Sequence, residues 1–279
     1  MKKCLIGIVG CEEYRKTRFE WMKKYSLDYL DNNLFDIKYF IGNSDLKKDW
    51  IEDGEIVYVR SGDKWRNLID KYTLVLNYSY YSEYAYTWYS DDDVFLCWKH
   101  FNNFNEIFSV KIDLYCTTGV NIYSPMKYFN VYGLSKVRQV DREKKIPLVN
   151  YNTKNPHIVA NNVSRTEMFF LTGGGALMKR RFLKFMIESL AKQQSKLDYI
   201  NENIDDGNGF ADAYISHCFN KNLPYRKENY TLEGKKFILG ENVLDNFEDN
   251  VISYHSAYLS SEETFKKVAI DYEQSLNKV

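Results

Sequence analysis

The sequence is poor in the residues that break, link or cross-link a chain. It has four prolines in 279 residues, and no stretch rich in proline, glycine or serine suggests a linker. Its five cysteines are an odd number without a Cys-x-x-Cys pair, which indicates neither a disulfide framework nor a zinc site. No internal repeat is visible. We therefore expect one continuous domain over residues 1–279, in a reducing compartment.

An excess of charge and a long hydrophobic run are also missing. The 38 basic and 38 acidic side chains cancel, so the overall charge favours no polyanionic partner such as nucleic acid. Charge interrupts the apolar residues of the amino terminus too early for a membrane span, and no Ala-x-Ala cleavage pattern follows. We expect a first buried strand there, no integral membrane segment, and a small neutral or metal-bridged substrate.

Short apolar runs alternate with amphipathic stretches in the first half of the sequence. This rhythm is typical of β-α-β units around a mostly parallel sheet with helices packed on it. It predicts strands at residues 4–9, 36–41, 55–59 and 84–89, and helices at 15–30 and 64–80.

The second half is less regular. It predicts strands at 111–117 and 169–178, the latter broken by glycines, and helices at 181–192, 209–220 and 261–275. Residues 134–165 are polar, contain two prolines and predict a long loop region, of a length that is often functional.

Three adjacent aspartates, Asp91, Asp92 and Asp93, follow the fourth predicted strand. Ligands of open α/β sheets bind outside the carboxyl ends of strands. Side chains alternate along an extended segment, so Asp91 and Asp93 would share one side and Asp92 the other. A pair of carboxylates suits Mg²⁺ or Mn²⁺, with substrate phosphates as further ligands. A solvated acidic turn is the alternative, but the aromatic and apolar residues on both sides disfavour it.

The region around these aspartates resembles a known family. An aromatic strand followed by Asp91-Asp92-Asp93-Val94-Phe95 looks like the D-x-D region of the inverting β-1,3-type galactosyltransferase and Fringe family. The upstream segments similar to family motifs are Arg18-Phe19-Glu20-Trp21 (R-x-T-W, with Glu20 in place of threonine), Lys38-Tyr39-Phe40-Ile41-Gly42 (F-L-x-G), Asp53-Gly54-Glu55-Ile56-Val57 (y-x-D-I-I) and Asn67-Leu68 with Lys71 (N-L-T-x-K). The order of these motifs, over roughly residues 5–260, carries the resemblance.

Downstream, the glycine triplet at residues 173–175 resembles the s-G-G-G-y-v-l-s segment of the family. Three glycines remove every Cβ atom along one stretch, which lets backbone N–H groups approach a sugar or diphosphate closely. A tight turn explains the three glycines equally well. A Walker-type phosphate loop is excluded, because no Gly-Lys-Ser/Thr follows at the required spacing.

Two later segments also fit the order of the family. Residues 211–216 resemble E-D-V-x-x-G and place Asp212 on the catalytic aspartate, although alanine replaces the glutamate and serine the glycine. Asp205 and Asp206 are therefore alternatives for this role. An apolar segment ends in His255, like the late metal-binding histidine of the family. A plain first-turn helix aspartate is the other interpretation of Asp212.

The resemblance implies a GT-A fold, a Rossmann-like α/β fold with a mostly parallel central sheet flanked by helices. Residues 1–125 would form the nucleotide-binding half, and 126–279 the acceptor-binding and catalytic half. It implies that Mn²⁺, or Mg²⁺, is held by Asp93 and His255. The residues implied to contact the nucleotide-sugar are Arg18, Lys71, Asp91, Asp92, Gly174 and Gly175, with Asp92 near the ribose or the donor sugar and the two glycines along the sugar pocket.

The implied reaction is transfer of a sugar from a nucleotide-sugar, with UDP as the expected nucleotide, to a glycan hydroxyl. The metal would act as a Lewis acid on the diphosphate, and Asp212 as general base, with inversion at the anomeric carbon. Animal members of the family carry a membrane anchor and paired cysteines, and this sequence shows neither. We therefore expect a soluble cytoplasmic enzyme that builds a microbial or viral surface glycan.

Two other classes of protein compete with this interpretation. A phosphatase of the haloacid-dehalogenase type also places D-x-D after a strand and uses Mg²⁺, but it needs its nucleophilic aspartate on the earliest core strand and a later G-D-x-x-x-D. A non-catalytic carbohydrate-binding module would explain the aromatic content and the imperfect motif around Asp212. It predicts sugar binding that survives EDTA.

Overall fold

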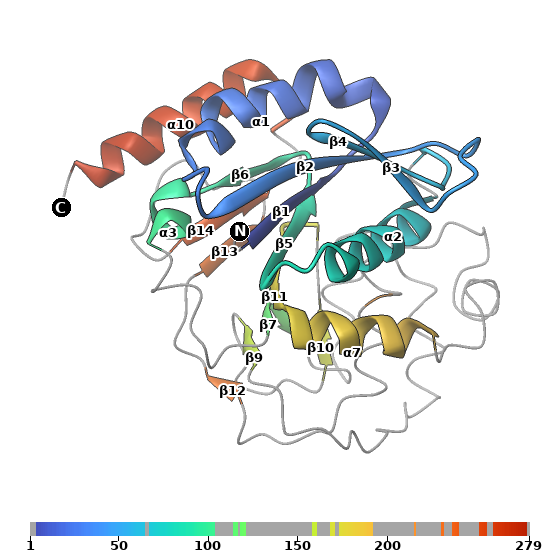
Figure 1. Ribbon diagram of the computed structural model, residues 1–279. Helices are drawn as coiled ribbons and strands as arrows, with labels where there is room; N and C mark the ends of the chain where they lie inside the picture. Colours follow the sequence, from blue (N-terminus) through green and yellow to red (C-terminus); the bar gives the residue numbers. More distant parts are fainter. Residues whose placement is uncertain are drawn as a thin grey trace, which may run out of the picture.

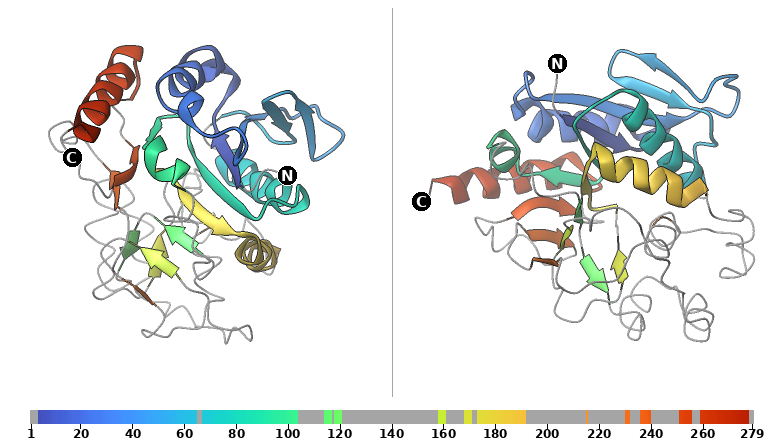
Figure 2. Two further views of the ribbon diagram at one scale, coloured as in Figure 1. Left: turned by 60° about the vertical axis from the view of Figure 1, so that its left-hand side comes forward. Right: turned by 60° about the horizontal axis from the view of Figure 1, so that its bottom comes forward.

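The computed structural model describes residues 4–64, 67–103, 114–116, 118–120, 158–160, 168–170, 173–191, 215, 230–231, 236–239, 251–255 and 259–277. A nine-stranded, mostly parallel sheet with the order β12-β9-β7-β11-β5-β1-β2-β4-β3 forms the centre of this part (Figure 1). Helices α1 and α10 lie on one face of it, and α2 and α7 on the other (Figure 2). The α/β class and the mostly parallel sheet predicted from the sequence are therefore confirmed.

The strands of the first half lie close to their predicted bounds. They are β1 (Cys4–Val9), β2 (Phe35–Gly42), β3 (Trp50–Asp53), β4 (Ile56–Val59) and β5 (Tyr86–Asp91). Strand β1 pairs in parallel with β2 on one side and with β5 on the other. The sequence did not indicate β3, because this edge strand is mostly exposed and carries no apolar alternation. It forms a hairpin with β4 through Gly54, whose positive φ of 61° suits glycine.

The helix expected at 15–30 is divided into short pieces. A 3₁₀ turn (Glu12–Tyr14), a π-helical turn (Arg15–Phe19), α1 (Glu20–Tyr25) and a second 3₁₀ turn (Leu27–Tyr29) follow one another. The break comes at buried Ser26, whose hydroxyl bonds to the backbone O and N of Leu96 at 2.9 and 3.0 Å. A tertiary contact therefore replaces the continuation of the helix.

The remaining elements are further strands of the nine-stranded sheet, the strands of two smaller sheets (β8 with β10, and β6 with β13 and β14), and helices. They are α2 (Leu68–Tyr81), β6 (Val94–Leu96), α3 (Trp98–Asn102), β7 (Leu114–Cys116), β8 (Thr118–Val120), β9 (Ile158–Ala160), β10 (Met168–Phe170), β11 (Ala176–Lys179), α7 (Arg180–Ala191), β12 (Tyr230–Thr231), β13 (Lys236–Leu239), β14 (Val251–His255) and α10 (Glu262–Leu276). Helix α10 starts with a capping box between Ser261 and Thr264. The short strand β9 lies within the loop region expected at 134–165, most of which, like the helix expected at 209–220, is outside the described residues.

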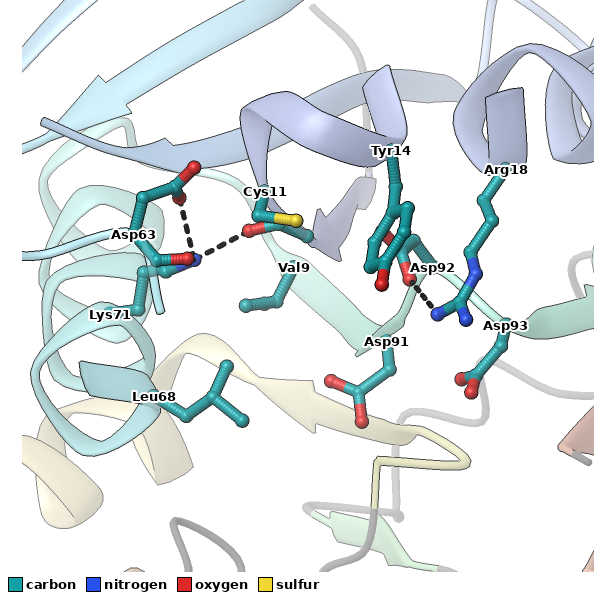
Figure 3. Close-up of a pocket in the computed structure, with 11 residues that line it drawn as sticks. Val9, Cys11, Tyr14, Arg18, Asp63, Leu68, Lys71, Asp91, Asp92 and Asp93 are labelled. Atoms are coloured by element: carbon teal, nitrogen blue, oxygen red, sulfur yellow. Dashed lines mark hydrogen bonds and ion pairs between the residues drawn. The ribbon is translucent and has the colours of Figure 1, made fainter. Parts of the chain in front are cut away.

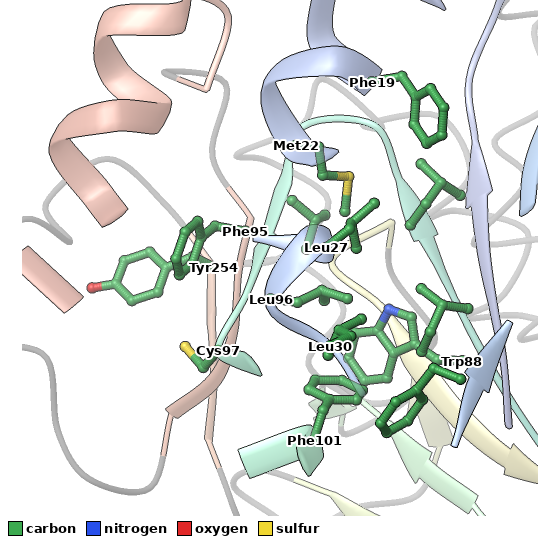
Figure 4. Packing of buried hydrophobic residues seen from close by; sticks show 14 of the residues in the cluster. Phe19, Met22, Leu27, Leu30, Trp88, Phe95, Leu96, Cys97, Phe101 and Tyr254 are labelled. Carbon is green, nitrogen blue, oxygen red and sulfur yellow. The ribbon is translucent and has the colours of Figure 1, made fainter. Parts of the chain in front are cut away.

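A core of large side chains fixes the position of β5 (Figure 4). Trp88 on β5 is fully buried and meets Phe101 edge to face, with ring centroids 5.1 Å apart. Gly175 leaves room for the indole, because a Cβ atom there would overlap the Trp88 ring, and its φ of 120° suits glycine alone. Burial of one such side chain contributes about 1.5–3 kcal/mol to the stability of the fold, so this packing holds β5 firmly in place.

Within the described residues, no helix has both the length and the apolar character needed to cross a membrane.

Candidate functional site

A cavity of about 250 Å³ lies at the carboxyl ends of β1 and β5 (Figure 3). The chain passes from β1 to β2 on one side and later returns, through α2, to β5 on the other side. Adjacent strands whose connections diverge in this way open the crevice in which α/β proteins bind ligands. The residues that line it are Val9, Gly10, Cys11, Tyr14, Arg18, Asp63, Leu68, Lys71, Asp91, Asp92 and Asp93.

The three aspartates connect two sheets. Asp91 is the last residue of β5 in the nine-stranded sheet, and Val94 begins β6 in a three-stranded sheet with β13 and β14. Figure 3 shows Asp91 and Asp93 pointing to the same side, whereas Asp92 turns toward Arg18. This is the alternation expected from the sequence.

Asp92 is a buried carboxylate with a partner on each oxygen. It is 4% exposed, accepts a hydrogen bond from Tyr39 Oη at 2.8 Å on Oδ2, and lies 3.3 Å from Arg18 Nη1 through Oδ1. Burial raises its pKa to about 6, with Asp93 adding to the rise and Tyr39 and Arg18 opposing it. Gly10 makes this packing possible, since a Cβ atom there would overlap both Tyr39 and Asp92.

Asp91 is held from two directions. Its Oδ1 accepts a short hydrogen bond from the hydroxyl of Tyr72 on α2, and its backbone N–H donates to the carbonyl of Gly173 at 2.8 Å. A Cβ atom at Gly173 would overlap the carboxylate of Asp91. The carbonyl of Gly174 in turn accepts from Ser253 Oγ of β14 at 3.0 Å. The glycine turn thus ties the end of β5 to β14.

Arg18 carries positive charge to the wall of the cavity. It belongs to the π-helical turn, a rare conformation that is frequent at functional sites. Its guanidinium lies 4.1 Å from the centre of the Tyr14 ring, a cation–π geometry. Burial of the guanidinium lowers its pKa, but the carboxylates of Asp92 and Asp93 raise the pKa by more. Arg18 therefore stays charged beside the acidic segment.

Lys71 also reaches the cavity, but protein groups surround its ammonium. The residue is 1% exposed, and Nζ donates to the carbonyl of Gly10 at 2.6 Å and to Asp63 Oδ1 at 2.9 Å. Asp63 additionally accepts from the backbone N–H groups of Glu12 at 2.7 Å and Gly42 at 2.8 Å. The pair joins the loops that follow β1 and β4 to the last residue of β2.

His255 is the last residue of β14, and the structure describes its backbone. Strand β14 pairs antiparallel with β6, so that His255 stands opposite Val94, the residue directly after Asp93. The register therefore brings the backbones of these two candidate metal ligands together. Asp212 and its alternatives Asp205 and Asp206 lie outside the described residues.

The donor groups at the cavity fit a hard divalent cation. Asp91 and Asp93 present carboxylates on one side, and oxygen ligands are those preferred by Mg²⁺ and Mn²⁺. An imidazole at position 255 would add a ligand that Mn²⁺ accepts. Within the part of the chain that the structure describes, no three or more His, Cys, Asp or Glu side chains are clustered to hold a metal ion. By themselves, the described carboxylates would supply only part of a ligand set for such an ion.

Sequence reasoning missed several residues of this site. Gly10, Cys11 and Asp63 follow predicted strands, so their position in the chain was the signal that could have found them. Tyr39 and Tyr72 look like ordinary core tyrosines in the sequence, and only the tertiary structure aims their hydroxyls at aspartates. Of the glycine triplet, Gly173 contacts Asp91, whereas Gly175 packs against Trp88.

No family model matches this chain, and no curated protein does. Its structure is similar to that of the galactosyltransferase LgtC in complex with donor and acceptor sugar analogs, with 9% identity and a TM-score of 0.45 over 95% of each chain. It is also similar to mouse xyloside xylosyltransferase 1 in the apo form, with 8% identity and a TM-score of 0.41 over 92% of this chain and 97% of that one. Likeness at this level leaves the function to be argued from the site.

Proposed function

We propose that this protein is an inverting, divalent-metal-dependent glycosyltransferase that moves a sugar from a nucleotide-sugar, with UDP as the nucleotide, to a hydroxyl of a glycan. The observation that carries the proposal is the cavity at the diverging ends of β1 and β5, where three aspartates and Arg18 meet. The order of motifs that resembles the β-1,3-type galactosyltransferase and Fringe family supports the proposal independently.

Asp93 and His255 would hold Mn²⁺ or Mg²⁺, with Asp91 on the same side of the segment as Asp93. Such an ion neutralises charge on the diphosphate that leaves the donor sugar.

Arg18 supplies a fixed positive charge for the anionic donor. Its side chain lines the cavity and is 23% exposed, and Asp92 and Tyr14 limit its movement. A planar, multidentate cation of this kind suits phosphate oxygens. Lys71 contributes by holding Gly10 and Asp63 in the cavity wall. Gly174 accepts a hydrogen bond from Ser253 of β14, Gly175 packs against Trp88, and their contact with the donor sugar stays part of the proposal.

Asp212 is the proposed general base, with Asp205 and Asp206 as alternatives. It would take the proton of the acceptor hydroxyl on the face of the sugar opposite the leaving diphosphate. Direct attack from that face inverts the anomeric carbon, and a positioned base contributes about a hundredfold to ten-thousandfold to the rate.

The position of β1 weakens the phosphatase alternative. A haloacid-dehalogenase-type enzyme needs a nucleophilic aspartate at the end of the earliest core strand, and β1 is followed by Gly10 and Cys11. Burial and the nearby carboxylates of Asp92 and Asp63 raise the pKa of the Cys11 thiol, which disfavours the thiolate form that a nucleophilic cysteine needs.

Calorimetric titration with UDP-sugars, with and without Mn²⁺, tests the proposal. We expect metal-dependent binding and turnover in the wild type. Asp93→Ala should lose the metal-dependent binding, and Asp212→Ala should keep the binding and lose turnover. Asp45→Ala, which changes an exposed aspartate that does not line the cavity, is the matched control. Sugar binding that survives EDTA without turnover of any donor would instead identify a carbohydrate-binding module.

A further inference from the structure

Each of the first two aspartates receives a hydrogen bond from a buried tyrosine. Tyr39 on β2 is 0% exposed and donates to Asp92 Oδ2 at 2.8 Å, with its hydroxyl also 3.2 Å from the carbonyl of Cys11. Tyr72 on α2 is 1% exposed and donates to Asp91 Oδ1. The two donors therefore come from different elements and reach different aspartates.

The rings of both tyrosines are fixed by aromatic neighbours. Tyr39 stacks on Phe19, with ring centroids 4.3 Å apart and an angle of 17° between the planes. Tyr72 meets Tyr89 edge to face, with centroids 5.1 Å apart and an angle of 70°. Because the rings are buried and packed, their hydroxyls have little freedom to follow a displaced carboxylate.

A glycine stands against each carboxylate. Gly10 leaves space for the hydroxyl of Tyr39 and for Asp92, and Gly173 leaves space for Asp91. Each aspartate thus lies against a tyrosine hydroxyl and a backbone that has no Cβ atom. This arrangement sets Asp91 into the cavity and Asp92 toward Arg18.

Both hydrogen-bond donors are neutral hydroxyl groups and not cations, which affects the charge that the aspartates present. At Asp91, a lysine or arginine in place of Tyr72 would orient the carboxylate but would also cancel its charge, whereas the neutral hydroxyl leaves that charge for a cation. At Asp92 the charge is met by Arg18 through Oδ1, and the neutral hydroxyl of Tyr39 fixes Oδ2 without adding a second cation. Burial and the charge of Asp92 raise the pKa of Tyr39 well above its usual range, so this hydroxyl remains a donor at neutral pH.

We propose that Tyr39 and Tyr72 are positioning residues, which hold Asp92 and Asp91 in opposite orientations so that the acidic segment is prepared for the metal and the diphosphate. The role in binding rests on the proposed function. The orientation of the carboxylates does not depend on it.

The test uses Tyr39→Phe and Tyr72→Phe in the full chain, because phenylalanine keeps the ring and removes only the hydroxyl. Tyr78→Phe is the matched control. Tyr78 lies on α2 like Tyr72, is also 1% exposed, and contacts Phe40 and Trp50 instead of the aspartates. Two readouts are needed: the affinity for UDP in the presence of Mn²⁺ by calorimetry, and the orientation of Asp91 and Asp92 in crystal structures of the variants.

We expect each of the two variants to bind UDP with Mn²⁺ about tenfold or more weakly, the effect typical of residues that orient metal ligands, with the control within about twofold of the wild type. Electron paramagnetic resonance of bound Mn²⁺ should change in Tyr72→Phe and not in the control. Unchanged affinity in both variants would overturn the positioning role. If the wild type binds neither Mn²⁺ nor UDP, the proposed function fails, but the crystal structures of the variants still test the positioning role. That role is supported if the carboxylates of Asp91 and Asp92 turn in the variants, and it is refuted if they keep their wild-type orientation.

Discussion

Two ion pairs face each other across the cavity, and they are built in opposite ways. In the pair of Lys71 and Asp63 the cation is buried, with its side chain 1% exposed, and the carboxylate is 28% exposed. In the pair of Arg18 and Asp92 the carboxylate is buried, at 6%, and the cation is 23% exposed. Figure 3 shows them on opposite sides of Val9 and Asp91.

The difference leads us to expect a supporting role for the pair of Lys71 and Asp63, and it fits the ligand-binding role proposed for Arg18. Lys71 donates its hydrogen bonds to Gly10 and Asp63, and these bonds hold together the loops of the cavity wall. Arg18 is held by Asp92 and Tyr14 and presents its remaining surface to the cavity. Removing Lys71 should therefore affect the stability of the fold, and altering Arg18 should affect the binding of an anion.

The largest effect is expected for Lys71→Met. The variant leaves Asp63 and the carbonyl of Gly10 without their cation, and breaking a buried pair from one side typically costs about 3–5 kcal/mol. We expect a loss near the lower end of this range, about 3 kcal/mol, because Asp63 is partly solvated. Urea unfolding measures it. Lys23→Met, which breaks the more exposed pair with Glu55, should cost less than about 1 kcal/mol. Equal losses in both variants would refute the supporting role.

The next effect concerns Asp92→Asn and its dependence on pH. The pKa of Asp92 rises from 3.8 to about 6 on folding, so the folded state binds the proton more tightly. Stability from this group is complete below about pH 4 and is lost as the pH rises through about 6. The loss corresponds to at most about 3 kcal/mol at neutral pH.

Asparagine cannot ionise, so Asp92→Asn should unfold at higher urea concentration than the wild type at neutral pH, by up to about 3 kcal/mol in free energy of unfolding. The difference between the two proteins should shrink as the pH falls toward 4. Unfolding curves at a series of pH values check this. A constant difference across the series, or a variant less stable at neutral pH, would contradict it.

A smaller effect is expected for Arg18→Lys. Lysine keeps the charge beside Asp92, so the fold should be retained, but it loses the planar fork and the contact with the Tyr14 ring. We expect binding of UDP with Mn²⁺ to weaken by about tenfold, or about 1.4 kcal/mol, with little change in the urea midpoint. Calorimetry at constant ionic strength measures the binding. A lower urea midpoint with an unchanged affinity for UDP would show that Arg18 supports the fold, as Lys71 does, and would refute its role in binding.

The smallest effect is expected for Tyr14→Leu. It removes a cation–π contact worth about 0.5–1 kcal/mol at a partly exposed site, so the affinity for UDP should fall by about twofold to fivefold. Tyr14→Phe keeps the aromatic face and serves as the control. If the phenylalanine variant loses as much affinity as the leucine variant, the ring is not what orients Arg18.

The sequence predicted the parts of the fold that depend on local pattern. Strands β1, β2 and β5 and helices α2 and α7 follow from their apolar periodicity, and the three aspartates were placed correctly at the end of β5. Local pattern could not indicate β3, a mostly exposed edge strand, or the break at Ser26, which depends on Leu96, 70 residues away.

The site shows the same limit. A binding role for aspartates at the carboxyl end of a strand can be predicted from the sequence. The roles of the Tyr39 and Tyr72 hydroxyls cannot, because they depend on contacts with aspartates that are 53 and 19 residues away in the sequence. The role of Lys71 is similar: the sequence places it near the nucleotide, and the structure shows its ammonium bonded to Gly10 and Asp63. The role expected of Asp212 stays a prediction.

The connection between the two sheets has a mechanical consequence. Only Asp92 and Asp93 separate β5 from β6, and three Cα steps span at most on the order of 11 Å. A connection this short leaves the two strands little freedom to move apart, and the hydrogen bond from Ser253 of β14 to the carbonyl of Gly174 links the two sheets a second time. Any sliding of β6 and β14 against the nine-stranded sheet would therefore move the backbone of the acidic segment and displace its carboxylates.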